Sequence, residues 1–233
     1  MRGHGLPSPK GKSMFIGHFA VGLIAKRAAP RASLGTLFFA AQFMDLLWPV
    51  LLLTGVEAVR IDPGNTIVTP LDLYNYPWSH GLYPVLIWAA VLALLYWLLR
   101  RSLSTGLVLG LVLASHWLLD YVTHRPDLPL APGDPRRFGL GLWNSLPGSI
   151  AVEAGLFVLG IWIYTGATRP ENRRGVWALW SLALVLLAIQ AANYFGPPPP
   201  DEQTLAYSAL GIWLFVFWGA WADRNRRVVK GGR

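Results

Sequence analysis

Acidic and imidazole side chains inside apolar stretches are the residues of this chain best able to do chemistry. They are His18, Asp45, His116, Asp120 and Glu153, with His80 and His124 at the ends of such stretches. A charged side chain inside a membrane is costly, so these residue types mark a functional site there by default. A single such histidine more often makes an interhelical hydrogen bond, but seven groups together favour the functional interpretation.

The spacing of three of these residues indicates metal binding. His116, Asp120 and His124 stand four residues apart, so they project from nearly one face of a helix. Two ligands at this spacing can chelate one cation. The chain has no cysteine, and imidazole with carboxylate ligands suits zinc, manganese or iron. A metal ion would also compensate the charge of a buried carboxylate.

Membrane-spanning helices are the elements predicted to carry these residues. The chain is 54% hydrophobic and 14% charged, with a mean hydropathy of +0.41, whereas a soluble domain carries about 25% charged residues. Stretches of roughly 20 apolar residues cross a bilayer. Six stretches qualify: Ser33–Gly55, Gly81–Leu99, Thr105–Val122, Ile150–Ala167, Val176–Phe195 and Leu205–Ala222. A shorter one, Met14–Ala25, either spans or is a tilted or re-entrant helix. The predicted fold is an all-α polytopic membrane bundle of six to seven hydrophobic helices.

One membrane domain is predicted between residues 14 and 223, with the candidate metal site carried by residues 14–164. Residues 1–13, rich in Gly, Pro and Lys, are expected to be a disordered leader, and residues 224–233 a basic cytoplasmic tail. No internal repeat is visible, which disfavours a transporter built from paired halves.

The net charge of +8 does not indicate a nucleic acid partner. Lysine and arginine gather in alternate short loops, where the positive-inside rule expects them, and they form no patch interleaved with aromatic residues. The alternation predicts a multi-pass protein of the cell membrane with a cytoplasmic C-terminus, so the lipid bilayer is its main partner. Under this topology the acidic and imidazole residues fall at similar depth near the extracytoplasmic face.

Four motifs around these residues resemble a known family. They are Met14-Phe-Ile-Gly-His18, Gln-Phe-Met-Asp45, Trp78-Ser-His80-Gly and Ser115-His116-Trp-Leu-Leu-Asp120. They resemble the bacterial inner-membrane metal-dependent hydrolases of YdjM type, over roughly Met14 to Tyr164. The resemblance implies an inner-membrane location and hydrolase activity on an undefined substrate.

The order of the residues is also similar to that of the ligands in the soluble, all-helical zinc phospholipase C superfamily, which reads His, Asp, His, His-xxx-Asp, His, His-xxx-Glu. The first six places are filled by His18, Asp45, His80, His116, Asp120 and His124. Glu153 fills the last place, but Ser149 stands where its partner histidine is expected, and the N-terminal Trp ligand is absent. This resemblance implies one complete zinc site formed by Asp45, His80, His116 and Asp120. A second ion near His18, or near His124 and Glu153, stays open.

These observations predict a membrane-embedded metal-dependent hydrolase of a phosphoester or lipid-linked ester at the extracytoplasmic face, with one or two ions, zinc by the resemblance. The metal would activate a water, and Glu153 or a carboxylate with an unused oxygen would act as general base. Arg60 is a candidate for holding a phosphate, and Asn144 for orienting a ligand or substrate. Two alternatives stay open: an ion- or proton-coupled transporter, and a non-catalytic membrane protein with a structural metal site.

Overall fold

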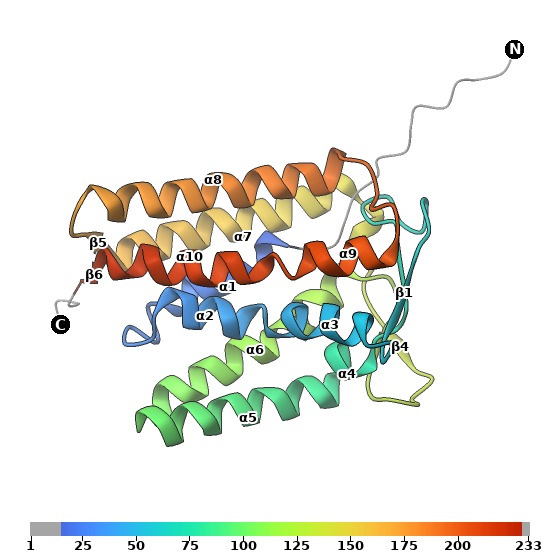
Figure 1. Cartoon of the computed structure of the whole chain (residues 1–233), viewed down its shortest axis with the longest axis horizontal. Coiled ribbons are helices and arrows are strands. Elements are labelled where there is room, and N and C mark those ends of the chain that lie inside the picture. Colours follow the sequence, from blue (N-terminus) through green and yellow to red (C-terminus); the bar gives the residue numbers. More distant parts are fainter. Residues whose placement is uncertain (1–14, 230–233) are drawn as a thin grey trace, which may run out of the picture.

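Long apolar helices run side by side in the computed structural model, which describes residues 15–229 (Figure 1). They are α5 (Leu82–Arg100), α6 (Leu103–Thr123), α7 (Leu146–Ala167), α8 (Arg173–Phe195) and the joined pair α9 (Glu202–Ala209) and α10 (Ile212–Arg224). By length and composition each of these five can cross a membrane. Large apolar side chains cover their outer faces, among them Leu111, Trp162 and Leu184. The prediction of an all-α membrane bundle is confirmed.

The predicted span Ser33–Gly55 is a broken one. It consists of α2 (Leu34–Ala41) and α3 (Phe43–Leu53), which are bent by 54° at Gln42. Pro49 lies inside α3, and its missing N–H removes a helical hydrogen bond to the carbonyl of Asp45. The bend lies three residues before Asp45. This carboxylate therefore lies in the first turn of α3 and not in the middle of one straight helix. Counting the pair as one span gives six.

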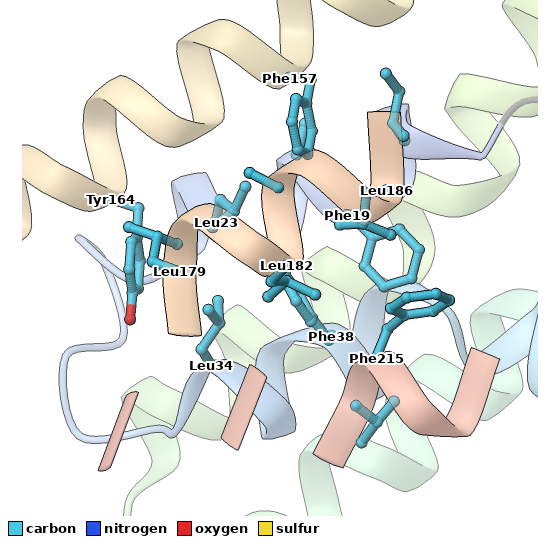
Figure 2. Packing of buried hydrophobic residues seen from close by; sticks show 14 of the residues in the cluster. Phe19, Leu23, Leu34, Phe38, Phe157, Tyr164, Leu179, Leu182, Leu186 and Phe215 are labelled. Atoms are coloured by element: carbon cyan, nitrogen blue, oxygen red, sulfur yellow. The ribbon is translucent and has the colours of Figure 1, made fainter. Parts of the chain in front are cut away.

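Helix α1 (Ile16–Ala25) is a buried helix too short to cross a bilayer. Its ten residues extend about 15 Å, half the thickness of the hydrocarbon core. Phe19 packs edge-on against Phe38 of α2 and Phe215 of α10, with ring centroids 4.9 and 5.7 Å apart. Figure 2 shows these rings together with Leu182 and Leu186 of α8. Of the two interpretations of this stretch, the structure therefore supports the helix buried among the others.

Short strands and turns cover one end of the bundle, here called the loop end (right in Figure 1). Strands β1 (Ala58–Ile61) and β2 (Leu71–Asn75) pair antiparallel there, as do β3 (Leu128–Pro129) and β4 (Arg137–Phe138). The short helix α4 (Pro77–His80) contacts α3, α5 and β3, and η1 (Leu142–Asn144) contacts α6 and α7.

The opposite end, here called the basic end, holds the turn between α1 and α2, the junction of α5 and α6, and strands β5 (Thr168–Pro170) and β6 (Arg226–Val228) (Figure 1). The predicted basic tail is thus partly ordered, because β6 pairs antiparallel with β5 directly after α10. The last four residues of that tail, and the predicted leader at residues 1–13, lie outside the described residues.

Small residues let α5 and α6 approach each other closely, which fixes α6, the helix that carries the two candidate ligands His116 and Asp120. A Cβ atom on Gly106 would come within 2.6 Å of the Ala93 carbonyl oxygen, and one on Gly110 within 3.0 Å of the Ala89 carbonyl oxygen. Such close backbone contact is the usual way in which membrane helices associate.

Candidate metal centre

Four helices bring acidic and imidazole side chains to one buried point near the loop end. α1 supplies His18, α3 supplies Asp45, α4 ends at His80, and α6 supplies His116 and Asp120. Within residues 15–229 they form two groups whose ligand atoms all lie within 4.8 Å of one another. One group is His18, His116 and Asp120, and the other is Asp45, His80 and His116. We call these five residues the cluster.

The first group has the spacing of ligands around a single ion. The Nε2 atom of His18 lies 3.2 Å from Nε2 of His116 and 3.2 Å from Oδ1 of Asp120. The Nε2 atom of His116 lies 3.2 Å from Oδ2 of Asp120. Ligand atoms bound tetrahedrally at about 2.0–2.1 Å are separated by about 3.3 Å, so these three residues need little movement to hold a metal.

The second group is slightly wider. Oδ1 of Asp45 lies 3.5 Å from Nε2 of His80 and 3.7 Å from Nε2 of His116. Oδ2 of Asp120 lies 3.8 Å from Nε2 of His80. The two oxygens of Asp120 therefore approach different histidines, Oδ1 facing His18 and Oδ2 facing His80 and His116.

The Nδ1 atom of His116 determines the direction of its ring. It lies 2.9 Å from the carbonyl oxygen of Ala41, and a carbonyl oxygen can only accept a hydrogen bond. Nδ1 is therefore the donor, and the Nε2 lone pair of the neutral ring points into the cluster. A histidine ligand with its other nitrogen held in this way is the usual arrangement in metal proteins.

His80 is oriented through a serine and a buried glutamate. The Oγ atom of Ser79 donates to Oε2 of Glu57 at 2.6 Å and lies 2.7 Å from Nδ1 of His80. Since the serine gives its one proton to the carboxylate, it accepts from Nδ1–H of His80. Glu57 is fixed in turn by the backbone N–H groups of Trp78 and Ser79, which donate to Oε1 at 2.7 and 2.8 Å. The Nε2 lone pair of His80 also points into the cluster.

His124, the C-cap of α6, lies at the edge of the cluster and belongs to neither group. Its Nδ1 lies 2.9 Å from Oδ1 of Asp127, and its Nε2 lies 3.8 Å from Oδ1 of Asp120. Tyr76 donates to the same Asp127 oxygen at 2.8 Å. Burial, together with the Asp127 carboxylate, raises the pKa of Tyr76 well above its usual value, so the phenol keeps its proton and remains a donor.

The cluster has the chemistry of a cation site. With the Nδ1 atom of His116 as donor, Nε2 of His116 and Oδ2 of Asp120 are two acceptors facing each other at 3.2 Å. Oδ2 of Asp120 is buried and receives no hydrogen bond within the described part of the chain. An extra proton would bridge one such pair of acceptors, whereas a divalent metal would bind several of the converging atoms at once. The donor set therefore fits a metal.

Glu153, the predicted general base, has other neighbours and belongs to neither group. Its Oε2 accepts from the backbone N–H of Phe15 at 3.0 Å, directly before α1. Its Oε1 accepts from Tyr194 at 2.9 Å and from Gln190 at 3.3 Å. In the structure this carboxylate connects α7 and α8 to the start of α1, the helix that carries His18.

The two predicted substrate-binding residues lie on the exposed surface of the loop end. The guanidinium of Arg60 stacks over the ring of Tyr74, 4.3 Å from its centroid, and lies 3.8 Å from Oδ2 of Asp72. Asn144 ends the short helix η1 and is exposed. Its neighbour Trp143 is buried against the His124 ring, with centroids 4.0 Å apart. Neither Arg60 nor Asn144 lines the cavity described next.

A small cavity of about 20 Å³ adjoins the cluster, and among its lining residues are Asp45, His80, Asp120 and His124. This volume is enough for about one water molecule. Asp45 also lines a larger cavity of about 280 Å³. Its side chain is 20% exposed, against 5% for Asp120, so Asp45 is the member of the cluster that is most accessible.

The orienting residues Glu57, Ser79, Tyr76 and Asp127 were not predicted from the sequence. Asp127 follows His124 by three residues in the run His-Arg-Pro-Asp, and this short spacing was a usable signal. Glu57 stands 22 residues before Ser79, and no local pattern links the two.

Comparison with known proteins identifies the family. Residues 14–195 match the family model described as the YdjM inner membrane protein. No curated protein and no solved structure matches the chain. The match covers most of the chain, which therefore belongs to the YdjM inner membrane protein family.

Proposed function

We propose that this member of the YdjM inner membrane protein family is a metal-dependent hydrolase that cleaves a phosphoester or a lipid-linked ester. The observation that carries the proposal is the convergence of three imidazole nitrogens and two carboxylates on one buried point. The same point adjoins a cavity, and room for a further ligand distinguishes catalytic from structural metal sites.

Zinc is proposed as the first candidate because of the resemblance in ligand order, and the number of ions is one or two. Each imidazole Nε2 has one lone pair, so His116 can serve only one of its two groups at a time. Asp120 can serve both, because Oδ1 lies near His18 of the first group and Oδ2 lies near His80 of the second. Two ions sharing Asp120 would use every member of the cluster, whereas one ion would select among them.

Among the cluster residues, Asp45 is in the best position to contact a substrate. It is the most exposed cluster carboxylate, and it lines both cavities, so a substrate group that arrives meets it first. Its second oxygen can accept a proton from an attacking water. A bound divalent metal would supply Lewis acidity and lower the pKa of that water. The role of general base for Glu153 stays a prediction, as do the roles of Arg60 and Asn144.

The loop end is proposed to face the extracytoplasmic side, with the C-terminus in the cytoplasm. The support is the distribution of charge, since Lys26, Arg101 and Arg173 all lie at the basic end, where the positive-inside rule expects the cytoplasm.

Metal analysis of the full chain, purified in lipid nanodiscs, tests the proposal. We expect one or two equivalents of zinc, manganese or iron, and hydrolysis of a phospholipid or phosphodiester that is lost with the metal. A protein that binds no divalent ion would overturn the proposal. Bound metal without hydrolysis would indicate a structural site, unless proteoliposomes show cation flux, in which case the transporter interpretation would replace it.

A further inference from the structure

The larger of the two cavities at Asp45, here called the lateral pocket, lies between helices within the membrane-spanning part of the bundle. Its walls come from α3, α8, α9 and α10, together with Phe15 and with Leu71 of β2, and its volume is about 280 Å³. Apolar side chains dominate the lining, among them Trp48, Ile189, Leu205, Ile212 and Phe215. Asp45 is the one ionisable residue in it, so the pocket suits an apolar group and disfavours a second charge.

The lateral pocket adjoins the cavity at the cluster. Asp45, Trp48 and Leu71 line both spaces. The connection from the loop end is narrow, because that cavity holds about 20 Å³ and Tyr76 and His124 line it as buried side chains. A substrate therefore has more room to reach Asp45 from the lateral pocket than from the loop end.

The rim of the lateral pocket borders the surface that faces lipid. Leu214 of α10 lines the pocket, yet 67% of it is exposed. Its neighbour Phe217 is 65% exposed on the same span. The break between α9 and α10, at Leu210 and Gly211, also borders the pocket. An apolar chain lying in the bilayer can therefore enter sideways between α8 and α10 without crossing water.

We infer that the substrate is an amphiphile whose ester-bearing head lies at the cluster and whose single apolar chain lies in the lateral pocket. This inference rests on the proposed hydrolase function for the position of the head. The position of the chain rests on the lining and the lipid-facing rim. An acyl chain and an isoprenoid chain share this chemistry, and the experiment distinguishes them.

Photolabelling of the full chain in nanodiscs tests the inference without requiring turnover. Two probes are used: a glycerophospholipid with a diazirine at the end of one acyl chain, and an isoprenyl monophosphate with a diazirine at the end of its chain. We expect one of them to label peptides that contain Ile189 or residues 205–215. Equal labelling by both probes along all spans would overturn the inference.

Two filling variants and one control variant complete the test. Ala209→Phe and Ile189→Trp place bulk in the lateral pocket, whereas Ala191→Phe adds the same bulk to an exposed position on α8 outside it. We expect labelling to fall about tenfold in the filled variants, with metal content unchanged, and to persist in Ala191→Phe. Unchanged labelling in both filled variants would overturn the inference. If the lateral pocket is labelled in a protein that binds no metal, the site for the apolar chain is supported and the proposed hydrolase function is contradicted.

Discussion

The hydroxyl of Ser79 lies 2.7 Å from Nδ1 of His80, with its own proton given to Glu57. Ser79→Ala removes the acceptor that orients the ring, so the affinity for metal should fall about 10–100-fold, the usual effect of losing such a partner. Titration of the metal-free protein with zinc measures it. Ser115→Ala is the control, because the Ser115 hydroxyl bonds the Val112 carbonyl of its own helix. Equal affinities in the two variants would show that the contact does not position His80.

His116→Ala should remove the ion that His116 binds, and hydrolysis with it, while the protein stays folded, because the single Nε2 lone pair of this histidine binds one ion. His18→Ala and Asp45→Asn each affect one group, so each should leave one ion bound if two are present. Metal content and thermal unfolding in nanodiscs measure these effects. An aggregated His116→Ala protein, together with an inactive parent, would indicate a structural site, since metal-binding free energy would then be folding free energy.

Glu153→Gln should lower the free energy of unfolding by about 1–3 kcal/mol, because one of its acceptor oxygens becomes a donor facing other donors. The groups left without an acceptor are the Phe15 N–H or the Tyr194 hydroxyl. Glu202→Gln, an exposed residue in the first turn of α9, is the control. Hydrolysis that disappears at unchanged stability would instead support Glu153 as the general base.

Asp223→Asn should destabilise the basic end by about 3–5 kcal/mol, the usual cost of leaving a buried charge without its partner. Lys26 is almost fully buried and donates to Oδ2 of Asp223 at 2.7 Å and to the Ala32 carbonyl at 2.8 Å. Thermal unfolding measures the change, with Glu171→Gln as an exposed control at the same end. Equal stabilities would mean that Lys26 finds another acceptor.

Single cysteines can test the orientation without background, since the chain has none. Asp62→Cys at the loop end should react with an impermeant maleimide added to intact spheroplasts, and Glu171→Cys at the basic end should react only after lysis. Both positions are exposed. The reverse pattern would place the cluster at the cytoplasmic face.

The sequence predicted those features that depend on local pattern. Hydropathy located the spans, and the four-residue spacing of His116 and Asp120 predicted that both reach one point, which their 3.2 Å contact confirms. The bend at Gln42 was missed, because α2 and α3 form one continuous apolar stretch. The contact of Glu153 with Phe15 was missed because it joins residues 138 positions apart, and only tertiary packing determines such a contact.

The ten-residue length of α1 has a consequence for biogenesis. A segment this short cannot partition into the bilayer as an independent span, so it must be enclosed by helices that are synthesised after it. Its start is held by Glu153 of α7, which is itself bonded to Tyr194 of α8. A nascent chain released after α6 would contain every member of the cluster. It would lack Glu153 and Tyr194, which hold the start of the helix that carries His18. Assembly of the cluster is therefore expected to wait until α8 has left the ribosome, because only then are both residues that hold the start of α1 present.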